Sequence, residues 1–158
     1  MKLANLMGRL TASSNFGDPS ARSTGEHLEW MDICNASAGL SDPLPWRLAV
    51  LKFMGDTTMY HQAHMSLVDW AVNVSWHEYA PAGKKFKVPE GKIVALSNAA
   101  LWEYAENDVG LSMAQLAARA DMARSTFVDW LWVYEVILQH LRVCEGVLER
   151  RLTERLIH

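Results

Sequence analysis

Residues 111–131 read LSMAQLAARADMARSTFVDWL, and this stretch decides the expected fold. Ser112 is typical of a helix N-cap, because its side-chain oxygen can accept a hydrogen bond from a first-turn backbone N–H. The spacing that follows predicts a short helix to Ala120. Asp121 would hold the turn, where a left-handed backbone usually requires Gly and where Asp is better tolerated than most residues. The inward face of this first helix would consist of Leu116, Ala117 and Ala120.

A second short helix is expected to begin at Arg124, after Met122 has packed the turn into the core. Phe127 and Trp130 (or Leu131) would face inward from it. Two helices with this apolar spacing across a tight turn are typical of a helix-turn-helix, whose second helix enters the major groove of DNA. Two ordinary amphipathic helices in a bundle would show the same spacing, and that alternative stays open. The outward face of the second helix would consist of Arg124, Ser125, Val128 and Asp129.

The residues expected to contact DNA come from two parts of the sequence. One part is the start of each of these two helices, and the other is the connector 79–91, which is broken by prolines and glycines and holds a cluster of lysines. Such lysines can contact phosphates, although a solvated connector would have the same composition. The predicted DNA-binding residues are Ser112, Ala123, Arg124, Ser125, Thr126, Val128 and Asp129, together with Lys84, Lys85 and Lys87.

Helical periodicity extends over most of the chain, with apolar residues recurring about every 3.6 positions. No proline follows Arg124 and only Gly146 interrupts the apolar pattern there, so the recognition helix is expected to run on toward the C-terminus. Further helices are predicted over 23–38, from Ser41-Asp42-Pro43 to Gly55, from Asp56 or Thr57 to about Trp76, and from Pro89 or Glu90 to about Asn107.

The predicted fold class is therefore all-α: a compact helical bundle with a C-terminal helix-turn-helix at 112–131 and a long terminal helix. Residues 1–22 are rich in Ser, Asn, Gly and Pro, and we expect them to form a flexible segment. Residues 23–158 would then form a single helical domain.

Net charge, cysteine content and hydrophobicity limit the functions that the sequence predicts. The net charge of −3 gives no global basic signature, so a DNA-binding protein of this composition needs a local basic patch. Cys34 and Cys144 belong to no CxxC pair, and buried thiols of a reduced cytosolic protein are expected. The sequence has neither a signal peptide nor an apolar stretch of membrane-spanning length, which predicts a cytoplasmic protein without a membrane partner.

Motifs for catalysis or metal binding are missing from the sequence. It contains no GxSxG, no phosphate-binding glycine loop and no HExxH, so we predict no enzyme and no catalytic residues. His61 and His64 lie three apart on one helical face, but no third ligand follows at a telling spacing. Neither a metal nor a cofactor is predicted.

The layout of the chain resembles the late-gene antiterminators of lambdoid bacteriophages, the Q proteins, over roughly residues 23–156. A polar N-terminal segment (SSNFGDPSARSTG) precedes a short helix, a helix with WRLA at 46–49 and a longer one with SLVDWA at 66–71. KIVALSNAALWEYAE at 92–106 and the C-terminal MARSTFVDWLWVYEVILQHL follow. The chain lacks the cysteine-rich zinc module of the lambda-like members, because it has no CxxC, so no zinc site is carried over.

This resemblance implies a specific activity. Proteins of this family bind double-stranded DNA at a late promoter, engage bacterial RNA polymerase paused just downstream with its sigma factor still bound, and make the polymerase pass terminators. On that basis the DNA-reading role falls on Arg124, Ser125, Val128 and Asp129, and the cell compartment would be the cytoplasm of a bacterial host.

Two alternatives belong to other functional classes. A helix-turn-helix repressor or activator would bind DNA without travelling with polymerase, and usually as a dimer. An α-helical adaptor or inhibitor would bind a protein partner through exposed Trp and Met residues and would not bind DNA. The oligomeric state, the DNA target and the polymerase subunit contacted are left open by the sequence.

Overall fold

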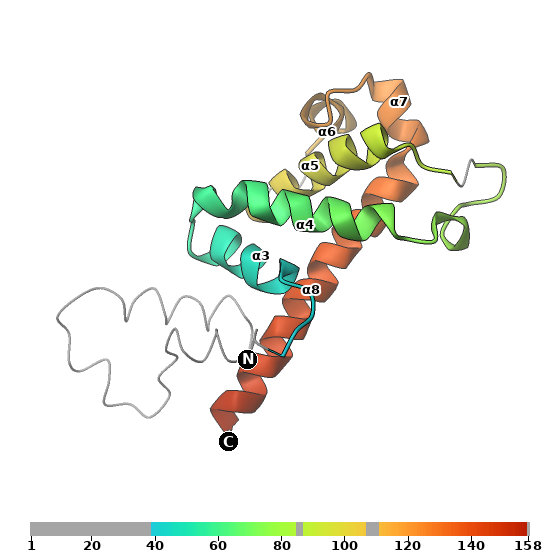
Figure 1. The fold of residues 1–158 in the computed structure, drawn as a ribbon. Helices are drawn as coiled ribbons and strands as arrows, with labels where there is room; N and C mark the ends of the chain where they lie inside the picture. Colours follow the sequence, from blue (N-terminus) through green and yellow to red (C-terminus); the bar gives the residue numbers. More distant parts are fainter. Residues whose placement is uncertain (1–38, 85–86, 107–110, 158) are drawn as a thin grey trace. The chain divides into compact units, whose positions relative to one another are not determined.

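The computed structural model describes residues 39–84, 87–106 and 111–157, and every regular element in these ranges is helical (Figure 1). The predicted all-α class is confirmed, while the helix predicted over 23–38 lies outside the described residues. The elements are α3 (Leu44–Phe53), η2 (Thr57–Met59), α4 (Tyr60–Val72), η3 (Trp76–Glu78), α5 (Glu90–Glu106), α6 (Met113–Arg119), α7 (Arg124–Asp129) and α8 (Leu131–Ile157).

The chain divides into two compact units, which are described separately. Unit 1 holds the described residues up to Tyr60 and those from Val143 onward, and unit 2 is His61–Arg142. Helix α8 therefore contributes its first part to unit 2 and its second part to unit 1. The division into a flexible segment 1–22 and a domain 23–158 stays a prediction.

Unit 1 is built on α3 and the second part of α8. Helix α3 starts where Ser41-Asp42-Pro43 predicts, because the Asp42 carboxylate accepts a hydrogen bond from the Leu44 backbone N–H at 2.9 Å. Lys52 of α3 pairs with Glu145 of α8 at 3.5 Å. The core of the unit consists of Leu44, Leu48, Ala49, Val50 and Leu51 on α3 and Cys144, Leu148 and Leu152 on α8.

Helix α4 is shorter than predicted, since it ends at Val72 rather than near Trp76. Side chains satisfy the carbonyls of its last turn: Trp76 donates from Nε1 to the Ala71 carbonyl at 2.9 Å, and Asn73 donates from Nδ2 to the Asp69 carbonyl at 2.7 Å. The chain can therefore leave the helix there with the Asp69 and Ala71 carbonyls bonded. Ala63, Leu67 and Ala71, which recur at helical spacing in the sequence, are buried.

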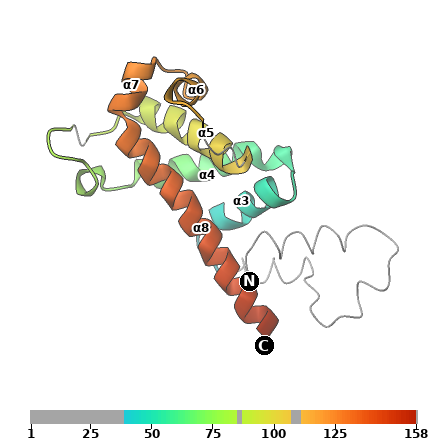
Figure 2. The same cartoon turned by 180° about the vertical axis from the view of Figure 1, so that it is seen from behind.

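Helix α5 agrees with the prediction to within one residue at its C-terminal end. Pro89 directly precedes the first residue of α5. A proline is tolerated there because the backbone N–H groups of the first turn have no acceptor within the helix, so the missing N–H of proline costs no hydrogen bond. In both views α6 lies beside α5 (Figure 1, Figure 2). Because α6 also contacts α7, the packing of α6 on α5 connects both helices to the core of unit 2. The buried apolar residues of α5 recur at helical spacing and include Ile93, Leu96, Ala100, Leu101 and Tyr104.

The prediction that the recognition helix runs on into the terminal helix is wrong. Helix α7 ends at Asp129, and α8 begins at Leu131, a residue predicted to belong to the helix-turn-helix. At Trp130 the backbone leaves helical geometry (φ −105°, ψ 9°), although neither Gly nor Pro marks the position. The long C-terminal helix is present, as α8. Among the described residues, no helix combines the length and the apolar character needed to cross a membrane.

Candidate nucleic-acid interface

Helix α6 begins with a complete capping box. The Ser112 hydroxyl oxygen accepts from the Gln115 backbone N–H at 3.2 Å, and the Gln115 side-chain oxygen accepts from the Ser112 N–H at 2.9 Å. The predicted N-cap is confirmed, with Gln in the reciprocal position. Ser112 is exposed. Its hydroxyl proton is still available as a donor, because the cap uses the oxygen only as an acceptor.

The turn after α6 has the geometry of a Schellman motif closed by an aspartate. Asp121 has φ 53°, in the left-handed region, as its place in the sequence predicts. The Met122 N–H donates to the Ala117 carbonyl at 2.9 Å, and the Asp121 N–H donates to the Ala118 carbonyl at 3.1 Å. These bonds satisfy the last carbonyls of α6 and redirect the chain into α7. Met122 is half-buried, so it covers the turn without entering the core completely.

Helix α7 has one anchoring side chain and one exposed face. Phe127 is completely buried and packs edge-on against Tyr134, with ring centroids 5.2 Å apart. The opposite face follows i, i+1, i+4 and i+5 spacing, and none of its side chains makes a hydrogen bond or ion pair with the described part of the chain. That exposed face consists of Arg124, Ser125, Val128 and Asp129.

Two further predicted contacts flank this face. Ala123 is the exposed N-cap of α7 and offers no side-chain hydrogen bond to the first turn. Thr126 is half-buried, which leaves it less available than its neighbours. Trp130, predicted to face inward, is also half-buried.

Of the three lysines, Lys84 and Lys87 are exposed, whereas Lys85 lies outside the described residues. A tight turn presents Lys84: its N–H donates to the Pro81 carbonyl at 3.1 Å, and Gly83 has φ 81°, as the third position of a type II turn requires. In both views this segment lies on the side of unit 2 where α7 meets α8 (Figure 1, Figure 2).

Lys84 and the end of α7 share a cavity that the sequence did not reveal. The cavity has a volume of about 270 Å³. It brings together a residue of the lysine connector and a residue of the exposed α7 face, which lie far apart in the sequence. Its lining residues are Gly83, Lys84, Asp129, Trp130 and Trp132.

The charges around α7 are mixed. Arg124, Lys84 and Lys87 are exposed cations, while Asp121 and Asp129 are exposed carboxylates. Arg119, the basic residue in the last turn of α6, is already paired with Glu106 of α5 at 2.8 Å. Among the described residues around α7, Arg124, Lys84 and Lys87 are therefore the exposed cations that no carboxylate pairs.

Known protein families, characterised proteins and solved structures include no match to this chain.

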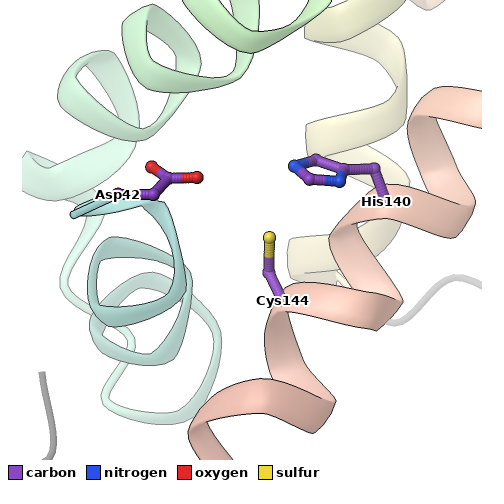
Figure 3. Close-up of side chains that lie close together, drawn as sticks. All are labelled: Asp42, His140 and Cys144. Carbon is purple, nitrogen blue, oxygen red and sulfur yellow. The ribbon is translucent and has the colours of Figure 1, made fainter. Parts of the chain in front are cut away.

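Unit 1 contains a carboxylate and a thiol close together. Asp42, before α3, and Cys144, on α8, have ligand atoms within 4.8 Å of one another (Figure 3). Burial raises the pKa of the Cys144 thiol to about 12, and the Asp42 charge adds to the effect. The thiol therefore stays protonated near neutral pH. Its burial agrees with the prediction of a buried thiol. Cys34 lies outside the described residues.

Two histidines of unit 2 have structural contacts. His64 places Nε2 at 3.1 Å from the Val94 carbonyl, which links α4 to α5. His140 of α8 stacks in parallel on Trp70 of α4, with ring centroids 3.6 Å apart. These contacts explain His64 and His140 as packing residues of the helices, whereas His61 is exposed on α4.

Proposed function

We propose that this protein is a sequence-specific DNA-binding transcription antiterminator, in which α6 and α7 act as a helix-turn-helix within a compact helical bundle. The observation that carries the proposal is the division of α7 into two faces. Phe127 fixes the helix to the core, and the side chains of Arg124, Ser125 and Asp129 have no hydrogen-bonding role within the described chain. A helix whose exposed polar side chains make no hydrogen bonds within the described chain can use those side chains to bind base edges.

Each predicted contact has a chemical role in this proposal. Arg124 lies in the first turn of α7, where a guanidinium can donate two hydrogen bonds to guanine O6 and N7. Val128 can contact a thymine methyl group, and Asp129 can accept from the amino group of cytosine. Lys84 and Lys87 would contact phosphates on the flank, which gives affinity and register but no sequence preference.

The step beyond DNA binding concerns RNA polymerase. Trp102 and Val94 are both 40% exposed on α5, and Trp at a surface commonly anchors a protein interface. DNA bound at the promoter would raise the effective concentration of this surface beside the paused polymerase. The mechanism is non-enzymatic: new contacts bias the elongation complex against pausing and termination. The resemblance in layout to the phage Q proteins motivates this part of the proposal.

In vitro transcription with bacterial RNA polymerase and sigma factor tests the function. The template carries the native late promoter and its DNA site upstream of a terminator, and a second template has the site scrambled. Added protein is expected to raise read-through on the first template only. Arg124→Ala should remove the effect, whereas Arg142→Ala, which alters an exposed arginine of α8, should leave it unchanged.

The same assay separates the alternatives. Blocked initiation at the promoter would identify a repressor, and site-dependent binding without any change in transcription would contradict antitermination. Failure of the protein to shift any duplex in electrophoresis, combined with capture of polymerase, would favour the adaptor. Capture that survives Arg124→Ala but weakens in Trp102→Ala would assign the polymerase contact to α5, with Val72→Ala as the control at another exposed apolar residue.

A further inference from the structure

We propose that the cavity between Lys84 and the end of α7 binds one unpaired nucleotide of a DNA strand, with a preference for a base that carries an exocyclic amino group. This inference rests on the proposed DNA binding, because α7 would bring the cavity to the duplex. It adds a second kind of recognition, of a base outside the double helix, to the reading of paired bases by the exposed α7 face.

Aromatic side chains form one part of the cavity. Trp130 and Trp132 both line it. Trp132 packs edge-on against Trp76, with ring centroids 6.1 Å apart at 80°. Trp76 is buried and its indole N–H is bonded to the Ala71 carbonyl. The Trp132 ring is therefore in contact with a buried, hydrogen-bonded neighbour, and an indole held in this way is suited to stacking on a planar base.

Two opposite charges complete the lining. The Lys84 ammonium can bind the phosphate next to an inserted base, and the type II turn at Gly83 fixes the backbone from which the Lys84 side chain extends. The Asp129 carboxylate is an acceptor only, so it favours bases that present an amino group. Thymine has no amino group, and its one ring N–H donor lies between two carbonyl oxygens that a carboxylate repels. A cation for phosphate, an acceptor for the base and an indole for its ring match one nucleotide.

The volume of the cavity fits this ligand. At about 270 Å³ it lies just below the range of roughly 300–1,000 Å³ that is usual for small-molecule pockets. The volume is sufficient for one base. Neighbouring bases cover both faces of a stacked base, so a base can contact the indoles of the cavity only after it has left the stack, which costs least at a nucleotide that is already unpaired.

Equilibrium binding to three short labelled duplexes tests the inference. They have the same sequence, and one is fully paired, one carries an extra unpaired dC and one an extra unpaired dT. The dC duplex is expected to bind at least about fivefold more tightly than the paired one, the lower end of what base stacking on an aromatic residue contributes. The dT duplex should fall in between. Quenching of tryptophan fluorescence should accompany the gain.

Exposed residues supply the variants, so that folding is preserved. Asp129→Asn should remove the preference for dC over dT, and its control is Glu135→Gln on an exposed carboxylate of α8. Lys84→Ala should reduce the gain from the unpaired base, and Lys87→Ala, outside the cavity, should reduce binding to all three duplexes equally.

The outcomes separate the two proposals. Equal binding to the three duplexes would overturn the nucleotide site and leave the DNA-binding proposal intact. Binding to the dC duplex without binding to the paired one would support the site and contradict recognition of paired DNA by α7. A dC preference that persists in Asp129→Asn would overturn the assignment of the base-binding role to Asp129.

Discussion

Helices α6 and α7 are neighbours of similar length, yet they are held in place in different ways. Side chains fasten α6 at both ends: the Ser112–Gln115 capping box closes its start, and the Arg119–Glu106 ion pair ties its end to α5. Helix α7 has no side-chain cap at Ala123, and its position depends on one buried ring, that of Phe127.

The two helices differ in whether their exposed polar side chains already have partners within the fold. On α6 the polar residues at both termini already have partners within the fold, so replacing them changes stability. On α7 the outer polar residues are without such partners in the described chain, and replacing them should change binding instead. Stability and DNA affinity should therefore separate between the two faces of α7.

Phe127→Ala should have the largest effect. Its side chain is fully buried, so removal leaves a cavity and should lower the free energy of unfolding by about 3–5 kcal/mol. Val128→Ala, at the adjacent exposed position, should change stability by less than about 0.5 kcal/mol. Urea denaturation followed by circular dichroism measures both. Equal losses in the two variants would contradict the assignment of one anchoring face.

Arg124→Ala should show the opposite pattern. We expect a loss of about 1–3 kcal/mol in binding to the cognate site and almost none on random DNA, because a base contact is lost. The midpoint of unfolding should stay unchanged. Equal loss on both DNAs would make Arg124 a phosphate contact, and unchanged binding to both would remove its role.

Removing the cap of α6 and adding a cap to α7 should make the stabilities of the two helix N-termini more similar. Ser112→Ala removes the capping box of α6 and should cost about 1 kcal/mol, whereas Ala123→Ser gives α7 a cap and should add up to about 1 kcal/mol of stability. Urea midpoints of the two single variants and the double variant measure these changes. Destabilisation by Ala123→Ser would show that the α7 start is held by contacts other than capping.

The sequence predicted the parts of this region that depend on local signals. Ser112 marked the start of α6, Asp121 the left-handed turn, and Pro89 the start of α5, because caps, turns and prolines act within a few residues. The regular apolar spacing predicted which residues are buried on α5 and α8, since one face of each helix must be covered.

What the sequence could not predict depends on contacts between distant residues. No Gly or Pro marks the break between α7 and α8 at Trp130. On either side of this break, the Phe127 and Tyr134 rings pack edge-on against each other. The early end of α4 depends on a hydrogen bond made by the Trp76 side chain. The cavity shared by Lys84 and Asp129 joins positions that no motif connects.

Replacing Asp121 by glycine should give the smallest effect and the finest test of the turn between the two helices. At φ 53° any residue with a Cβ is strained, although Asp is strained less than most, so Asp121→Gly should raise the free energy of unfolding by about 0.5 kcal/mol. Asp121→Ala should lower it, because alanine tolerates the left-handed region less well than aspartate does. Asp129→Gly is the matched control: Asp129 is the last residue of α7 and does not have a positive φ, so glycine relieves no strain there and stability should fall. Urea midpoints of the three variants should therefore rank Asp121→Gly highest. If Asp121→Gly instead lowered the free energy of unfolding, contacts of the Asp121 side chain would stabilise the turn. The turn would then resemble the two ends of α6, which side chains also stabilise.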